Sequence, residues 1–237
     1  EEASVLCFTD GNTIVPMISA QDHKRISDGD MGANTGGMGA YAPAPVMTKE
    51  LDKIVYDTIL LPAVKAMKKE GCPFKGCLYA GLMITKDGPK VVEFNCRFGD
   101  PETEAVLPLL ESDLAKIMLA CTKGTLKKER VEWKNACAVD VVLASEGYPA
   151  THSSGEEISG LEEAKKIGCL VFHAGSMKKK GRYFVNGGRV LNVAAVAPTL
   201  KEARDKAYEG VSKISWRGMQ YRHDIADKGL KRLKKRK

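Results

Sequence analysis

The sequence has 237 residues, which is enough for one large domain or two small ones with a substantial core. Hydrophobic residues make up 43% and charged residues 28% of it, close to the globular average, which excludes collagen, coiled coils and largely disordered chains. No apolar stretch approaches the roughly 20 residues of a membrane helix, so we expect no membrane partner.

The formal net charge of +7 is spread unevenly along the chain. Residues 1–120 hold 12 basic and 17 acidic side chains, whereas residues 121–237 hold 25 and 13. Seven basic residues lie within the last ten positions: Lys228, Lys231, Arg232, Lys234, Lys235, Arg236 and Lys237. Such a run can bind nucleic acid, but no aromatic residues are interleaved with it, so we favour a solvated tail or a linker.

The cysteines indicate a reducing compartment. There are seven of them, an odd number, and none form a CxxC pair. The four histidines are scattered along the chain. These patterns argue against a disulfide framework or a zinc site, and we expect reduced thiols in a cytosolic protein.

The first half of the chain alternates strand and helix patterns. Residues 3–9 and 13–18 form a predicted hairpin around an Asp-Gly-Asn turn, and residues 20–45 form a long loop. A helix is predicted from Thr48 to Gly71, kinked or divided at Pro62, and then a hairpin of residues 76–85 and 90–95. Residues 103–121 read as helical. Because the chain opens in a strand without an initiator Met, we expect it to be part of a longer protein.

The second half begins after a charged break at residues 123–132. It predicts a strand at 136–145, a loop at 147–160, a strand at 169–173 and a hairpin of residues 182–185 and 189–196. Thr199, with Glu202 three residues later, predicts a capping box that opens a helix running to about Lys213, and a basic helix ends the chain.

The end of the predicted strand at 90–95 carries the strongest chemical signal. Because side chains alternate on a strand, Glu93, Asn95 and Arg97 should share one face, with Cys96 directed toward the core on the other. A carboxylate and an amide oxygen suit Mg²⁺ or Mn²⁺, and a guanidinium suits a phosphate or oxyanion. An exposed Glu–Arg pair would give the same pattern. Asp100 follows closely, before the predicted helix.

The long loop carries a second constellation. Lys24 and Arg25 precede the glycine-rich run Asn34, Thr35, Gly36, Gly37, Met38, Gly39. Glycines allow a ligand close to the backbone or form an anion nest, although flexible loops share this composition.

Together these motifs resemble the glycinamide ribonucleotide synthetase (phosphoribosylamine–glycine ligase) family of ATP-grasp enzymes. The resemblance rests on four segments in the first half, at residues 21–25, 34–41, 78–81 and 93–102, and on further pieces at 147–149, 172–175 and 187–191. It implies an α/β (α+β) fold, with the second half of an ATP-grasp domain at residues 1–124 and a small mixed α/β C-terminal domain at 125–237.

The resemblance also implies a reaction in purine biosynthesis. Glycine reacts with ATP to give glycyl phosphate and ADP, and 5-phosphoribosylamine then displaces phosphate to form the amide. Glu93 and Asn95 match the family's metal ligands, and Arg97, Lys24 and Arg25 would contact phosphoryl or acyl-phosphate oxygens. Asn34, Thr35, Gly36 and Gly37 would shape the glycine and ribosylamine pocket. Asp100 would orient an amine, and Arg189 would hold the ribose 5-phosphate.

Two consequences and two alternatives follow. The family's ATP-closing flap and adenine hinge cannot be read in this chain, so we expect the chain alone to be inactive. Fusion of the parent to other purine-pathway domains, as in family members in animals, is left open by the sequence. A second acidic metal ligand, common in ATP-grasp enzymes, would fall near Gly81, where there is none. The alternatives are another ATP-grasp carboxylate–amine ligase or carboxylase, and a nucleic-acid-binding module based on the basic tail.

Overall fold

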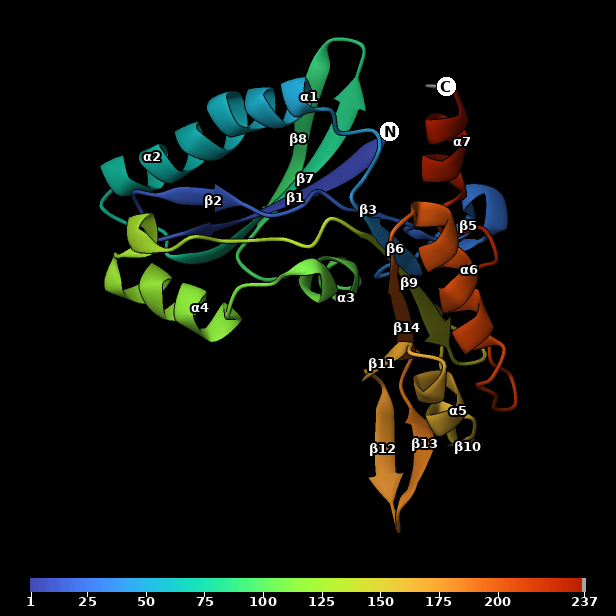
Figure 1. Cartoon of the computed structure of the whole chain (residues 1–237). Coiled ribbons are helices and arrows are strands. Elements are labelled where there is room, and N and C mark those ends of the chain that lie inside the picture. The colour runs from blue at the N-terminus through green and yellow to red at the C-terminus, as the bar shows by residue number, and fades with distance from the viewer. Residues whose placement is uncertain (236–237) are drawn as a thin grey trace. The chain divides into compact units, whose positions relative to one another are not determined.

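The computed structural model describes residues 1–235, which form two compact units (Figure 1). Unit 1 consists of residues 1–21, 43–99 and 109–135, and unit 2 of residues 22–42, 100–108 and the described residues from 136 onward. The chain therefore enters each unit more than once. The sequence analysis divides the chain into two consecutive domains at residue 124, whereas these units are each made of several segments, so that boundary stays a prediction.

Unit 1 is built on an antiparallel sheet with the order β2 (Ile14–Pro16), β1 (Glu2–Thr9), β7 (Gly76–Thr85), β8 (Gly88–Asn95). Both predicted hairpins are confirmed, since β1 pairs with β2 and β7 with β8. In the first turn Asp10 Oδ1 accepts hydrogen bonds from the backbone of Asn12 and Thr13, at 3.0 and 2.7 Å. This Asp-Gly-Asn turn closes on itself as its sequence predicts.

A long helical run covers one face of this sheet. It comprises α1 (Lys49–Val55), a π-helical turn (Tyr56–Leu60) and α2 (Leu61–Lys69), without the predicted division at Pro62. The wider π turn precedes Pro62, which lies in the first turn of α2, where its missing N–H is tolerated. Leu60 and Val64 pack with Val5 and Leu78 in the core of the unit.

The predicted helix at residues 103–121 is wrong in its continuity. The chain forms α3 (Glu102–Val106), a 3₁₀ turn (Leu107–Leu109), and then α4 (Leu114–Lys123), which Asp113 caps. Between them, the backbone of Leu109 and Glu111 bonds to that of Lys134 and Glu132. This extended pairing withdraws the intervening residues from the helix.

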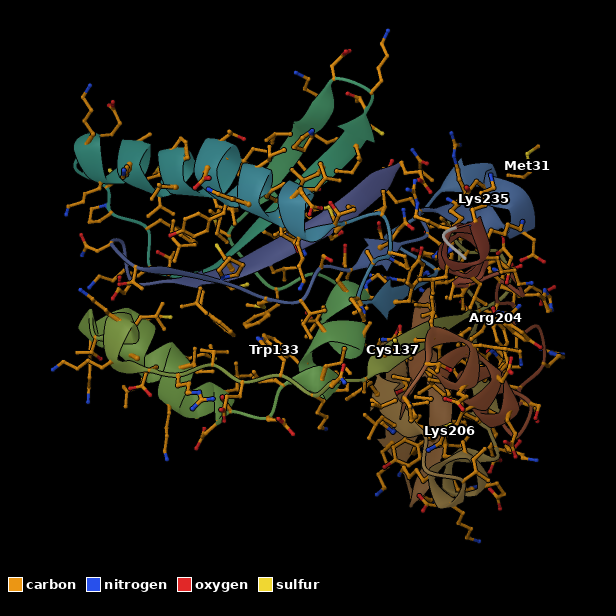
Figure 2. The ribbon with its side chains drawn as sticks, turned by 45° about the horizontal axis from the view of Figure 1, so that its top comes forward. Met31, Trp133, Cys137, Arg204, Lys206 and Lys235 are labelled. Atoms are coloured by element: carbon orange, nitrogen blue, oxygen red, sulfur yellow. The ribbon has the colours of Figure 1, made fainter. Side chains whose placement is uncertain are left out.

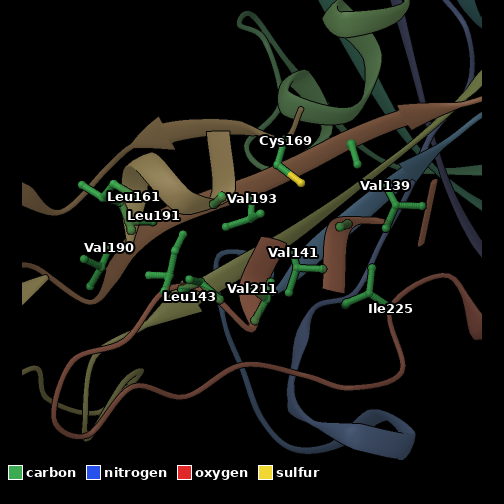
Figure 3. Close-up of a cluster of buried hydrophobic side chains, with 14 of the residues drawn as sticks. Val139, Val141, Leu143, Leu161, Cys169, Val190, Leu191, Val193, Val211 and Ile225 are labelled. Carbon is green, nitrogen blue, oxygen red and sulfur yellow. The ribbon is translucent and has the colours of Figure 1, made fainter. Parts of the chain in front are cut away.

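Unit 2 centres on a sheet with the order β11 (Leu170–His173), β14 (Arg189–Ala197), β9 (Cys137–Ala144), β6 (Gly39–Ala42), β3 (Gln21–Asp22). Helix α6 (Leu200–Val211) packs on one face, and the predicted capping box of Thr199 and Glu202 is confirmed. Side chains from β9 and β14, including Val141, Leu143 and Val193, meet in the core beneath it (Figure 3).

A smaller sheet has the order β10 (Ser154–Ile158), β13 (Arg182–Asn186), β12 (Ser176–Lys179), and α5 (Leu161–Lys166) follows β10. The predicted hairpin of residues 182–185 and 189–196 is wrong, since β13 pairs with β10 and β12 while β14 pairs with β9 and β11. The chain passes between the sheets at Gly187, where an added Cβ would lie 2.9 Å from the Cα of Gly175. A glycine is therefore required at this crossing point.

Both predicted loops contain regular structure. Residues 20–45 include β3, β4 (Arg25–Ser27), a 3₁₀ turn (Asp28–Asp30), β5 (Met31–Asn34) and β6, and residues 147–160 include β10. Their strands are short, polar or rich in glycine, so they lack the apolar alternation that marks a strand.

The chain ends in the predicted basic helix, α7 (Asp227–Lys235). Of the predicted basic tail, Arg236 and Lys237 lie outside the described residues. No helix within residues 1–235 combines the length and apolar character needed to cross a bilayer.

Candidate functional site

The end of β8 brings two of the predicted metal ligands together. Asn95 Nδ2 donates a hydrogen bond to Glu93 Oε1 over 3.0 Å, so the two head groups lie side by side. Rotating the amide by half a turn, which exchanges its oxygen and nitrogen, would set a carbonyl oxygen beside the carboxylate. Two hard oxygen donors at this separation fit a divalent cation that takes its other ligands from phosphate and water.

The opposite strand position carries no carboxylate. Gly81 pairs with Glu93, and an added Cβ at Gly81 would lie 3.3 Å from Glu93 Cγ. The register places Gly81 where the sequence analysis put the missing acidic ligand. Within residues 1–235, no three His, Cys, Asp or Glu side chains are grouped as a cation site.

Two expectations for the residues after Glu93 are wrong. The strand ends at Asn95, so Arg97 is not the third residue on one strand face; its exposed guanidinium donates to the carbonyl of Phe98 over 2.9 Å. Cys96 is exposed rather than directed into the core, and Val92 and Phe94 are 63% and 45% exposed. Because β8 is an edge strand of its sheet, its side chains have neighbours on one side only.

In unit 2 the basic pair and the glycine-rich run of the long loop are brought together. Thr35 Oγ1 donates to the carbonyl of Lys24 over 2.8 Å, and Arg25 pairs with Asn34 across the β4–β5 hairpin. Lys24 Nζ lies 2.8 Å from Asp22 Oδ2, and Arg25 Nη1 donates to the carbonyl of Gly32 over 2.7 Å. We call residues 22–37 the ligand loop.

Arg189 joins the ligand loop to Asp100. Its Nη1 donates to the carbonyls of Gly36 and Asp100, each over 2.9 Å, and lies 2.9 Å from Asp100 Oδ1. A Cβ at Gly36 would lie 2.9 Å from Arg189 Cζ, and one at Gly37 would lie 2.3 Å from Pro101 Cδ. The two glycines therefore make room for a side chain and a proline of the same unit.

Two carboxyl groups in unit 2, Glu104 partly buried and Asp140 fully buried, were not singled out by the sequence analysis. Burial, followed by the charge of Asp100, raises the pKa of Glu104 to about 7, against a partial opposing effect of Arg189. Asp140 on β9 is fully buried, and burial together with Glu104 and Asp100 raises its pKa well above the ordinary value. Neither Asp140 oxygen has a hydrogen-bond partner among the described residues, nor does Glu104 Oε2. Glu104 ends the run from Arg97 that carries the family resemblance, and no motif surrounds Asp140; in both cases only the packing identifies a carboxyl group with a raised pKa.

A histidine of the ligand loop and a surface hollow complete the description of unit 2. His23 is buried, with Nδ1 3.4 Å from the carbonyl of Gly39, and so lines the interior of unit 2. An open hollow of about 440 Å³ lies on the small sheet, lined in part by Met177, Lys179 and Phe184, and it includes none of the predicted site residues.

Comparison with solved structures defines the class of the protein. The chain superposes on the biotin carboxylase domain of a thermophilic 2-oxoglutarate carboxylase with a TM-score of 0.64 and 16% identity, over 92% of this chain and 47% of that one. At this identity the likeness shows the fold alone. The family model of the phosphoribosylglycinamide synthetase ATP-grasp (A) domain matches residues 1–103, and that of the synthetase C domain matches residues 138–228. The chain is thus an ATP-grasp protein.

Closer relatives define the family. A phosphoribosylamine–glycine ligase from Thermotoga maritima superposes with a TM-score of 0.83 at 38% identity, over 94% of this chain and 55% of that one. The chain is 53% identical over 231 residues to the trifunctional purine biosynthetic protein adenosine-3 of Gallus gallus, covering 97% of this chain and 23% of that protein. It is 51% identical to the ligase of Neisseria meningitidis serogroup B, covering 98% and 55%. This chain belongs to the phosphoribosylglycinamide synthetase family, and it spans about half the length, or less, of these relatives.

Proposed function

We propose that this chain is the part of a phosphoribosylamine–glycine ligase that holds the metal–phosphate ligands and the ligand loop. The complete enzyme would use ATP to join glycine to 5-phosphoribosylamine in purine biosynthesis. The observation that carries the proposal is the adjacent pair of oxygen donors, Glu93 and Asn95, within the matched ATP-grasp domain. Identities near 50% to ligases support the substrate assignment.

The proposed reaction has two steps. A carboxylate oxygen of glycine attacks the γ-phosphorus of ATP, giving glycyl phosphate and ADP. The amine of phosphoribosylamine then attacks the glycyl carbonyl carbon, loses a proton, and phosphate leaves. Both steps need alignment of the reactants and neutralisation of phosphate charge, with little covalent work by the protein.

Glu93 and Asn95 would hold Mg²⁺ or Mn²⁺ against the phosphates. The bound ion would neutralise charge on the β- and γ-phosphate oxygens. The exposed guanidinium of Arg97 is available to phosphoryl or acyl-phosphate oxygens, a planar donor fork that suits them.

In unit 2, Lys24 and Arg25 would contribute positive charge to the phosphate or acyl phosphate. Residues 34–37 would shape the pocket for glycine and the ribosylamine, and Asp100 would orient an amine. The predicted binding of the ribose 5-phosphate by Arg189 competes with its contacts to Gly36, Gly37 and Asp100, so we propose that Arg189 also fixes the shape of this pocket.

A chimaera tests this function. Joining this chain to the part of the Neisseria meningitidis ligase that it does not match should give ADP release that requires both glycine and phosphoribosylamine. The chain alone should be inactive, as the sequence analysis expects. Glycine-independent turnover in the chimaera, or bicarbonate-dependent turnover, would instead favour another ATP-grasp ligase or carboxylase.

Metal binding can be tested without turnover. We expect Glu93→Gln to weaken Mn²⁺ binding in the presence of ADP by more than about tenfold. Replacing a residue that only hydrogen-bonds to a metal ligand already lowers metal affinity by about tenfold, and Glu93 would be a ligand itself. The free Mn²⁺ signal in electron paramagnetic resonance measures it. Glu70→Gln, which changes an exposed acid at the end of α2, is the matched control. Equal Mn²⁺ affinity in the two variants would remove Glu93 from the metal site.

The basic tail favours the nucleic-acid alternative less than its charge suggests. Lys228 pairs with Asp30 within unit 2, so one cation of the tail already has an intramolecular partner. We propose a cytosolic location from the seven free thiols, although a relative from Arabidopsis thaliana is described as chloroplastic. Fusion to further purine-pathway domains, as in the trifunctional relatives, is also proposed only for the complete protein.

A further inference from the structure

The β4–β5 hairpin at the centre of the ligand loop has no apolar anchor. No side chain from Lys24 to Gly36 is buried, and Met31 at the tip is 66% exposed (Figure 2). Two-stranded hairpins are marginal in water on their own. Polar contacts must therefore hold this one in position.

Those contacts converge on one buried arginine. Arg222, whose side chain is 0% exposed, lies shortly before α7, and all three of its guanidinium nitrogens donate hydrogen bonds, Nη1 to the hairpin. Nη1 donates to the carbonyl of Arg25 and to Asp30 Oδ1, each over 3.0 Å. Nε and Nη2 donate to the two carboxylate oxygens of Asp224, each over 2.7 Å.

Asp224 adds a hydrogen bond to the tip of the hairpin. Its Oδ2 also accepts the backbone N–H of Gly29 over 2.9 Å. Two nearby residues add to this: the backbone N–H of His223 donates to Asp28 Oδ1 over 2.7 Å, and Lys228, at the start of α7, pairs with Asp30. Both acids of the tip are thus bound by residues 222–228.

The segment that holds the hairpin is itself fixed to the core. Tyr208 on α6 donates its hydroxyl to the carbonyl of Arg222 over 2.7 Å, and Arg204 donates to the carbonyls of His223 and Ile225, each over 3.1 Å. Helix α6 packs on β9 and β14. A continuous chain of contacts therefore runs from the core of unit 2 through Arg222 to the hairpin.

The hairpin in turn sets the residues that we assign to ligands. Lys24 immediately precedes β4, and β5 ends at Asn34, where the glycine-rich run begins. We propose that Arg222 is a positioning residue that fixes the ligand loop in its binding conformation without contacting the ligand. The structural part of this proposal stands alone, whereas its effect on catalysis rests on the proposed ligase function.

Hydrogen exchange of this chain tests the structural part. In Arg222→Met we expect amides of residues 24–37 to exchange about tenfold faster or more, while β9 and β14 keep their protection, because the hairpin opens locally. Arg217→Met is the matched control, since the Arg217 side chain is 86% exposed and its ion pair with Glu156 is long, with 3.8 Å between Nη2 and Oε1. Asp224→Asn keeps the arginine and weakens its bidentate pair, and it should show a smaller change of the same pattern.

The outcomes separate the alternatives. Unchanged exchange of residues 24–37 in folded Arg222→Met would overturn the proposal, and so would an equal increase across β9 and β14, which would mark Arg222 as a general stabiliser. If Arg222→Met fails to fold, Asp224→Asn decides by the same criteria.

A kinetic measurement tests the catalytic part. In the chimaera, Arg222→Met should raise KM for glycine or phosphoribosylamine about tenfold while KM for ATP changes less than twofold. An equal loss for all three substrates would refute the positioning role. An inactive wild-type chimaera would refute the proposed function and leave the exchange result to decide on Arg222.

Discussion

Replacing Glu104 by Gln should stabilise unit 2 in a way that depends on pH. Glu104 lies on α3, with one carboxylate oxygen buried and without a hydrogen-bond partner among the described residues. Burial first, and then the neighbouring charge of Asp100, raises its pKa from 4.5 to about 7. Gln has nearly the same shape and cannot ionise, so the variant removes the cost of charging this site.

The sign follows from proton linkage. Between pH 4.5 and 7 the folded state binds more protons at Glu104 than the unfolded state does, so stability falls as the pH rises through this range. The full shift corresponds to about 3 kcal/mol at 1.36 kcal/mol for each pH unit. Partial exposure of the carboxyl screens this cost, and we expect about 2 kcal/mol. The gain from Glu104→Gln should be near zero at pH 4.5 and reach about 2 kcal/mol at pH 8.

Urea unfolding at the two pH values measures this gain. Both proteins should carry Trp133→Phe, so that fluorescence reports on Trp216, which lies in unit 2. Glu163→Gln, an exposed acid on α5, is the control and should show no gain at either pH. If Glu104→Gln gives the same change in stability at pH 4.5 and pH 8, then Glu104 is not held protonated by burial, and the reasoning fails.

Two further predictions concern stability. Gly160→Ala should destabilise the protein by more than about 3 kcal/mol, because the position has a φ of 83° and an added Cβ would lie 1.8 Å from the carbonyl oxygen of Lys213. A melting temperature within a few degrees of that of the wild type would contradict this prediction. His23 should destabilise the folded state in acid, because burial and then the positive charge of Arg222 lower its pKa from 6.5 to about 4. The free energy of unfolding should therefore fall by up to about 3 kcal/mol as the pH drops through this range. His23→Asn should flatten the acid side of a plot of urea midpoint against pH, and an unchanged plot would show that His23 is not the group responsible.

The parts of the fold that the sequence predicts are those determined by neighbours in the chain. The hairpin around Asp10 closes through bonds spanning two or three residues, and the capping box needs only Thr199 and Glu202. Strand β6 is predicted as loop, and β13 is predicted as a strand but with the wrong partner. Their partners lie on β9 and on β10 and β12, and pairing over such separations leaves no periodic pattern within the short strand itself.

In the candidate site, too, the sequence predicts what neighbouring residues determine and misses what distant residues determine. Strand alternation predicts that Glu93 and Asn95 lie side by side, and their hydrogen bond agrees with it. The same alternation is wrong for Arg97 because it assumes that the strand continues past Asn95. Arg222 carries no local signal, since it acts on residues almost 200 positions away. Glu104 ends the run from Arg97 that resembles the family motif, but its raised pKa follows only from its burial and its neighbours.

The glycines of the ligand loop also have a structural role. Their spacing favours close approach of a ligand to the backbone. In the structure, the space beside Gly36 is filled by the guanidinium of Arg189 and the space beside Gly37 by Pro101. Arg189 also bonds to the carbonyls of both glycines and of Asp100. Because a side chain at either glycine would separate these segments, the two glycines determine the shape of the proposed pocket wall, whether or not a ligand touches them.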